Sequence, residues 1–193
     1  RHFLAELNFL MESGNWKDAD LNTASLIILL GMTEEGFGRN NLSCRDLGTI
    51  DRLWVERSEG KFGFSVQKSI LDRFASQPGH YNEGVNLEGF YEKIGWGEEG
   101  NGVGDRRGRR YEGRSREGVL SDPQGIRYWE EHGVFNLQKA ERGHLPVSVW
   151  LGLVRPFVQG AGWWHVDGVF GRLIAQRLVE CNIQAFQPSI KIP

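Results

Sequence analysis

Cysteines are scarce in this sequence, and long hydrophobic runs are missing. The two cysteines, Cys44 and Cys181, lie far apart in a chain of 193 residues. This usage is typical of a reducing compartment rather than of a disulfide-stabilised scaffold, so we predict that the two cysteines are unpaired. No stretch approaches the roughly 20 apolar residues that a membrane-spanning helix needs, and we therefore expect a soluble protein.

A strong charge of either sign is also missing. The formal net charge is −2, which gives no overall electrostatic case for nucleic-acid binding. Hydrophobic residues make up 39% and charged residues 25%, as in globular proteins. Seven tryptophans and eleven phenylalanines favour either an aromatic core or a pocket for a flat ligand. Because Arg1 already lies in an apparent helix, we expect a fragment or a processed form.

Sequence signals of catalysis are missing as well. The five histidines lie in unrelated contexts, and no spacing typical of zinc ligands occurs. Gly100, Gly102 and Gly104 follow no predicted strand and precede no Lys-Ser or Lys-Thr, so they do not form a phosphate-binding loop. No pairing of a nucleophile with a base can be identified. The sequence therefore predicts a protein that is not an enzyme and has neither catalytic residues nor a metal site.

Apolar residues at helical spacing dominate the part of the chain before residue 95. Gly14 interrupts the first helical run and Asn15 opens the next, which predicts a helical hairpin. Ser43, with an acidic residue three positions later, resembles a capping box at the start of a third helix. The expected helices contain residues 3–11, 16–30, 47–54, 66–74, 87–94 and about 167–181. The predicted fold class is all-α, a compact multi-helix domain.

Other residues predict where these helices begin and end. Ser65 is expected to cap the fourth helix, and Pro78-Gly79 to end it. Gly95 is placed to end the fifth helix because glycine tolerates the left-handed conformation found after helix ends.

Residues from 97 to about 125 are dense in glycine and arginine and poor in large apolar residues. Such a composition does not offset the entropy of ordering the backbone, so we expect a mobile loop. Its arginines are best interpreted as solvated, ahead of contacts with nucleic acid, propionates or anionic lipid. We expect one domain over residues 1–193, with a core of about 1–147, an insertion of about 97–127 and a helical extension of about 148–193.

Two passages carry a family resemblance. They are Asp51-x-Leu53-Trp54-Val55-x-x-Ser58-x-Gly60-x-Phe62-Gly63-Phe64-Ser65-Val66-Gln67 and Gly143-His144-Leu145-Pro146. Supporting matches are Trp16-Lys17-x-Ala19-Asp20-x-x-Thr23 and Ile94-Gly95-Trp96. Together they resemble the genomes-uncoupled-four family over roughly residues 4–147, apart from the insertion.

The resemblance implies a small all-helical domain, shaped like a cupped hand, that binds protoporphyrin IX and magnesium protoporphyrin IX. It implies a regulator of magnesium chelatase in chlorophyll biosynthesis, with the large chelatase subunit as partner. The expected location is the cytoplasm of a cyanobacterium or the plastid stroma, with peripheral membrane contact, and the expected state is a monomer without specific nucleic-acid binding. The ligand groove would lie beneath the loop from Trp96 to Pro146. Because this loop is longer than in the family, a linear bilin is an alternative ligand.

A porphyrin is a broad apolar plate with two propionates, so its site needs apolar walls and a cation for the carboxylates. Arg142 is the predicted cation, with Arg127 as a second choice. The other predicted porphyrin-binding residues are Phe62, Phe64, Gln67, Trp96, Phe135, Leu137, His144, Leu145 and Pro146.

Several of these residues have a structural interpretation beside the functional one. Trp54 is interpreted as core. Phe62 and Phe64 fit core anchors and a pocket floor equally well. A role for Gln67 in fixing its turn is favoured over a carboxylate contact, and a structural hydrogen bond of His144 is favoured over axial metal ligation. Alternative functions are a bilin-binding or protein-interaction sensory module on the same fold and, third, RNA binding.

Overall fold

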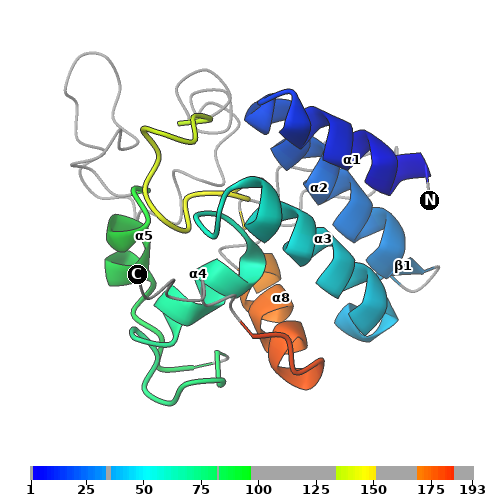
Figure 1. Ribbon diagram of the computed structural model, residues 1–193. Helices are drawn as coiled ribbons and strands as arrows, with labels where there is room; N and C mark the ends of the chain where they lie inside the picture. Colours follow the sequence, from blue (N-terminus) through cyan, green and yellow to red (C-terminus); the bar gives the residue numbers. More distant parts are fainter. Residues whose placement is uncertain (1, 34–35, 82, 97–133, 151–168, 185–193) are drawn as a thin grey trace, which may run out of the picture.

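The computed structural model describes residues 2–33, 36–81, 83–96, 134–150 and 169–184, which are coloured in Figure 1. Within these ranges the structure is helical, so the predicted all-α fold class is confirmed. The only strands found there are β1 (Met32–Thr33) and β2 (Gly36–Phe37), a short antiparallel pair. The helices are α1 (His2–Glu12), α2 (Trp16–Gly31), the 3-10 helix η1 (Arg39–Asn41), α3 (Cys44–Arg57), α4 (Phe64–Leu71), α5 (Leu87–Lys93) and α8 (Val169–Glu180).

The first three α-helices pack side by side (Figure 1). Gly14 adopts a φ of 73°, and Asn15 follows it as the residue before α2, so the predicted hairpin between α1 and α2 is confirmed. Beneath the hairpin, the rings of Trp16, Trp54 and Phe62 meet with centroids 5.5 to 6.3 Å apart. Trp54 is fully buried and its indole N–H donates to Thr23 Oγ1 at 3.0 Å, which confirms its place in the core.

The start of α3 has the predicted cap. Ser43 Oγ accepts a hydrogen bond from the backbone N–H of Asp46 at 3.0 Å and donates one to Asp46 Oδ2 at 2.7 Å. These contacts satisfy one of the amide groups that a helix start leaves unpaired. The predicted cap at Ser43 is therefore confirmed, although the Asp46 carboxylate bonds to the Ser43 hydroxyl rather than to the backbone N–H that a full capping box uses.

The predicted cap of α4 is wrong. The helix begins at Phe64 with Gly63 as its N-cap, so Ser65 lies inside it. The backbone N–H of Ser65 donates to Asp51 Oδ1 at 2.8 Å, which means that a carboxylate from α3 replaces a local cap. The helix also ends at Leu71, well before Pro78-Gly79. In contrast, α5 ends as predicted, with Gly95 at a φ of 78°.

The prediction that the cysteines are unpaired is wrong. Cys44 and Cys181 form a disulfide across a sequence separation of 137 residues. The pairing follows from helix packing, because α8 lies against α3 and α4 (Figure 1). Cys44 is the first residue of α3 and Cys181 follows the last residue of α8, so the packed helices bring the two thiols together.

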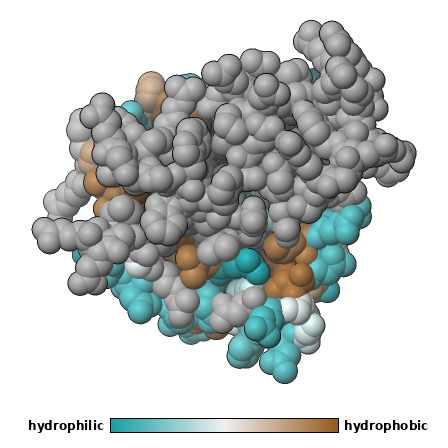
Figure 2. Space-filling model, turned by 180° about the vertical axis from the view of Figure 1, so that it is seen from behind, coloured by the Kyte–Doolittle hydropathy of each residue, from teal (hydrophilic) through white to brown (hydrophobic). Residues whose placement is uncertain are grey.

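Within the described ranges, no helix is both long and apolar enough to cross a lipid bilayer. Seen from behind, the described surface is mostly hydrophilic, with smaller hydrophobic areas beside it (Figure 2). The Gly/Arg-rich insertion, most of the extension after residue 147 and Trp163-Trp164 lie outside the described residues.

Candidate functional site

The two family motifs contact each other directly in the structure. The buried side chain of Gln67 donates from Nε2 to the carbonyl oxygens of Gly143 at 3.0 Å and Pro146 at 2.8 Å. Its Oε1 accepts a hydrogen bond from the indole N–H of Trp150 at 2.9 Å. Gln67 therefore has structural hydrogen bonds, but they fix the segment 143–146 and not, as was predicted, its own turn.

Backbone contacts strengthen this junction. The N–H of Gly63 donates to the carbonyl of Leu145 at 3.0 Å, and the N–H of Gly143 donates to that of Lys61 at 2.9 Å. Gly143 has a φ of 84°, and a Cβ there would lie 2.7 Å from Ile70 Cδ1. Only glycine meets both constraints without movement of its neighbours. The motif glycines thus allow the close approach of two segments that lie far apart in the sequence.

His144 has a structural hydrogen bond, as predicted. Its side chain is buried, and Nδ1 lies 2.9 Å from the carbonyl oxygen of Ile94. Because a carbonyl can only accept, Nδ1 carries the proton. Burial lowers the pKa of His144 to about 4, and the positive charge of Lys61 acts in the same direction. The ring is therefore neutral near pH 7.

Four aromatic residues pack against one another, with Trp96 beside His144, and we call them the aromatic cluster: Phe90, Tyr91, Trp96 and Trp150. The ring centroids of Phe90 and Trp150 are 5.0 Å apart, and those of Trp96 and Trp150 are 5.9 Å apart. The indole N–H of Trp96 donates to the carbonyl of His144 at 3.0 Å. Trp96 is 7% exposed, so among the described residues its ring is enclosed mainly by other rings.

A buried carboxylate fixes the chain that follows the second motif. Asp20 of α2 accepts hydrogen bonds from the backbone N–H of Val147 at 2.7 Å, the N–H of Ser148 at 3.1 Å and the Ser148 hydroxyl. Burial raises the pKa of Asp20 to about 6, although these hydrogen bonds act in the opposite direction. No role was predicted for Asp20, although its place in the motif that starts at Trp16 was an available signal.

A shallow pocket of about 390 Å³ opens between the turn after α1 and the segment 135–138. Two predicted site residues, the half-buried Phe135 and Leu137, line it. The other lining residues are Met11, Glu12, Gly14, Trp16, Arg57, Asn136 and Gln138. The pocket thus combines apolar surface with a cation that the sequence analysis missed.

The rim of the pocket is held by charged contacts. Arg57 Nη2 lies 2.6 Å from Glu12 Oε1, and the same guanidinium donates to Asn8 Oδ1 at 2.7 and 2.9 Å. Lys61 Nζ donates to the carbonyl of Leu137 at 2.6 Å and so fixes the opposite wall. Arg57 and Lys61 occupy unspecified positions inside the longer family motif, so only their spatial contacts mark them.

The remaining predicted site residues are divided between core and surface. Phe62, Phe64, Leu145 and Pro146 are buried. Arg142 is exposed, and its side chain is in none of the ion pairs among the described residues. Arg127 lies outside the described residues. Across the described ranges, no group of three or more His, Cys, Asp or Glu side chains is arranged to hold a metal ion.

Comparison with known proteins identifies the family. The family model described as GUN4-like matches residues 2–159. The chain is also similar to "Uncharacterized protein ycf53" of Porphyra purpurea, with 36% identity over 47% of this chain and 37% of that protein. The matched part of the chain thus spans little more than a third of that curated relative. Because the family model covers most of the chain, including every motif quoted above, the protein belongs to the GUN4-like family.

Proposed function

We propose that this protein binds protoporphyrin IX or magnesium protoporphyrin IX and regulates magnesium chelatase in chlorophyll biosynthesis. The observation that carries the proposal is the family match over residues 2–159. The GUN4-like family supports a tetrapyrrole-binding, regulatory role at the family level, and its domain is a non-catalytic one. The identity of the ligand and the large chelatase subunit as partner are the finer parts of the proposal.

We place one edge of the ligand over the pocket between α1 and the segment 135–138. Its volume of about 390 Å³ falls within the roughly 300–1,000 Å³ of small-molecule sites. Trp16, Phe135 and Leu137 offer apolar surface to the macrocycle. An apolar plate gains free energy when it covers such side chains and excludes water from both surfaces.

The deeply buried motif residues support this site in the proposal rather than form its surface. Gln67 and His144 are each 1% exposed, and Phe62 and Leu145 are fully buried. A ligand contact by these side chains would require the core to open. We therefore assign them to positioning the segment that carries Phe135, Leu137 and Arg142.

Arg142 is our candidate for the propionate contact. Its guanidinium is exposed and is not engaged in an ion pair among the described residues, so a carboxylate can approach it without displacing a partner. Arg57, by comparison, is already bound to Glu12 and Asn8. A propionate near Arg57 would have to compete with the Glu12 carboxylate, which makes Arg57 the second choice.

The test is a titration with deuteroporphyrin IX, followed by quenching of tryptophan fluorescence. The proposal predicts saturable quenching. Arg142→Ala should weaken binding of the dicarboxylate by about tenfold to a hundredfold, because about 1.5 to 3 kcal/mol of charged hydrogen bonding is lost. The dimethyl ester should bind both proteins equally. Arg45→Ala, an exposed arginine at the far end of α3 from the pocket, is the matched control.

Three results would count against this assignment. Wild-type protein that shows no saturable quenching would argue against porphyrin binding itself. Equal losses for the dicarboxylate and the ester would remove Arg142 from the propionate contact. Protein purified from its native host with the absorption spectrum of a linear bilin would replace the porphyrin by that ligand. In a magnesium chelatase assay, the porphyrin-loaded protein should raise the rate of magnesium insertion.

A further inference from the structure

Helix α8 lies beyond the part of the chain that the family model matches, which ends at residue 159. It nevertheless packs against α3 and α4, the two helices that carry the longer family motif (Figure 1). Among the side chains of α8 that the structure describes, Ile174, Ala175 and Leu178 are the buried hydrophobic ones. A helix of 12 residues is marginally stable alone, so α8 depends on its attachments.

The disulfide is the attachment at the C-terminal end of α8. Cys44 is exposed and Cys181 is half-buried. A reductant in solution can therefore reach the bond without unfolding of the core. A non-covalent contact lies nearby, where Arg177 Nε donates to the carbonyl of Leu42 at 3.0 Å.

The N-terminal end of α8 is seated on the aromatic cluster. Gly171 is so close to the indole of Trp150 that a Cβ at this position would overlap the ring. Trp150 is 2% exposed, and it donates to Gln67. The position of α8 is thereby connected through one tryptophan to the junction between the two motifs.

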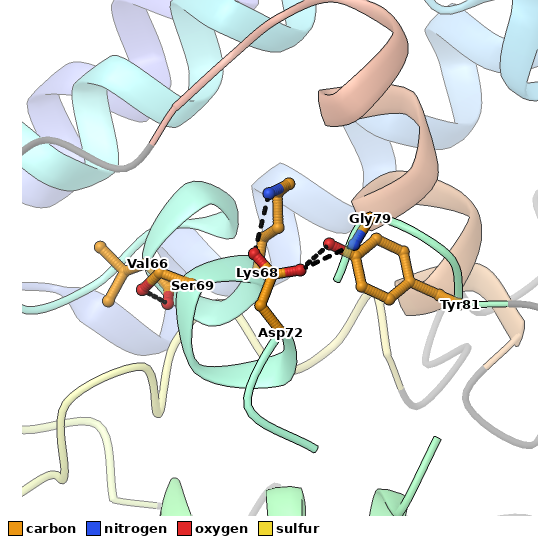
Figure 3. Close-up of polar contacts among 6 residues, drawn as sticks. All are labelled: Val66, Lys68, Ser69, Asp72, Gly79 and Tyr81. Atoms are coloured by element: carbon orange, nitrogen blue, oxygen red, sulfur yellow. Dashed lines mark hydrogen bonds and ion pairs between the residues drawn. The ribbon is translucent and has the colours of Figure 1, made fainter. Parts of the chain in front are cut away.

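The side of α8 also rests on a fixed loop. Val179 lies beside Gly79. A Cβ added to Gly79 would lie 3.9 Å from both methyl carbons of Val179, which is an ordinary contact distance. Asp72 fixes this loop by accepting hydrogen bonds from the Gly79 N–H at 3.0 Å and from the Tyr81 hydroxyl (Figure 3). Lys68 Nζ pairs with Asp72 Oδ2 at 3.0 Å in the same view. The loop beside α8 is therefore fixed by hydrogen bonds to Asp72.

We propose that the Cys44–Cys181 disulfide is a redox-controlled latch, and that its reduction loosens α8 and uncovers Trp150. The reductant is a dithiol, either a small molecule or a protein with two vicinal cysteines. One thiolate attacks the exposed Cys44 sulfur, forms a mixed disulfide and releases the Cys181 thiolate, which takes up a proton. The second thiol of the reductant then displaces Cys44, so the protein gains two thiols and the reductant becomes the disulfide. This regulation goes beyond the proposed porphyrin binding and does not depend on it.

The test compares oxidised protein with protein treated with dithiothreitol, without denaturant and without porphyrin. Alkylation followed by intact mass measurement should add two groups to the reduced protein. Amide hydrogen exchange of residues 171–180 should then accelerate by about tenfold or more, while exchange in α2 stays unchanged. Two results overturn the latch: thiols that appear only after denaturation, and exchange of α8 that is equal in both redox states.

Variants separate the latch from a general effect of the reductant. The double variant Cys44→Ser with Cys181→Ser should exchange like reduced protein, with or without dithiothreitol. Gly171→Ala should accelerate exchange in α8 with the disulfide intact, because the new methyl group overlaps Trp150. Gly48→Ala is the matched control, since its Cβ would meet Ile183 at an ordinary 3.5 Å. If amide exchange of α8 in Gly171→Ala is as slow as in the oxidised wild type, the packing of α8 does not depend on its contact with Trp150.

Discussion

Gln67 satisfies three polar groups that have no access to water. The carbonyls of Gly143 and Pro146 and the indole N–H of Trp150 all bond to its amide. An apolar replacement would leave these groups buried without partners, which costs about 1–3 kcal/mol for each. One side chain therefore contributes to the attachment of the second motif and of the aromatic cluster together.

Gln67→Leu should lower the free energy of unfolding by at least about 3 kcal/mol, since three hydrogen bonds are lost at a buried position. Urea unfolding followed by circular dichroism measures the change. Gln138→Leu, at an exposed position on the pocket rim, should stay within about 0.5 kcal/mol of the wild type. Similar stability of Gln67→Leu and wild type would contradict the role assigned to the amide.

Phe64→Ala tests whether this ring belongs to the core. Because Phe64 is 2% exposed, the substitution should cost roughly 3–5 kcal/mol of stability. Porphyrin affinity of the folded protein should be retained. Phe9→Ala, which removes a ring that is 66% exposed, is the control and should have little effect. Weakened binding with an unchanged melting temperature would instead make Phe64 part of the ligand surface.

At the scale of elements, helix starts are fixed in two different ways. Local residues cap α3, because the Ser43 hydroxyl lies three positions from the amide that it serves. A distant carboxylate, Asp51, serves the start of α4. Burial raises the pKa of Asp51, while its hydrogen bonds to Ser65 and Phe64 act in the opposite direction. The first arrangement can be predicted from sequence order, and the second depends on how α3 and α4 pack.

Ser43→Ala should destabilise the protein by about 1 kcal/mol, because the amide of Asp46 loses its partner. Thermal or urea unfolding will detect this change. Ser25→Ala is a suitable control, since Ser25 lies exposed in the interior of α2 and bonds only back to the carbonyl of Leu21. A loss as large for Ser25→Ala would show that the cap has no special role.

For the whole molecule, two buried groups give opposite pH dependences. Burial lowers the pKa of His144 to about 4 in the folded protein, whereas its ordinary pKa is 6.5. Below pH 6.5 the unfolded chain therefore binds a proton that the folded protein does not. This contribution to stability is lost as pH falls through that window. The pKa of Asp20 is raised to about 6 by burial, so its contribution is fully present below the unfolded value of 3.8 and is lost as pH rises through 6.

Separate variants should reveal the two opposing contributions. When the pH is lowered from about 6.5 to about 4.5, the free energy of unfolding of His144→Gln should rise by about 2 kcal/mol, because protonation of Asp20 stabilises the fold and His144 no longer opposes it. For Asp20→Asn, the free energy of unfolding should fall by about 2 kcal/mol over the same decrease in pH, because only the effect of His144 remains. Urea unfolding at both pH values, with the wild type as reference, measures each slope. Parallel slopes in all three proteins would contradict these pKa directions.

Much of the helical fold and the family could be predicted from the sequence. The hairpin at Gly14, the cap at Ser43 and the end of α5 at Gly95 depend on residues within one or two turns of each other. The candidate site was only partly predictable. Phe135 and Leu137 line the pocket, but Arg57 and Trp16 reach it from other elements. Which residues line a site depends on contacts between segments, and the order of residues does not record them.

The all-α class, the local signals that start and stop helices, and the motifs that identify the family can be read from the order of residues. The pairing of Cys44 with Cys181, the contact of Asp51 with the start of α4, and the burial of Gln67 and His144 arise only when the chain is packed. The physical reason is the range of the interactions. Helical spacing and caps act over a few residues, whereas a disulfide or a buried hydrogen bond requires two distant segments to be brought together by packing of the whole chain.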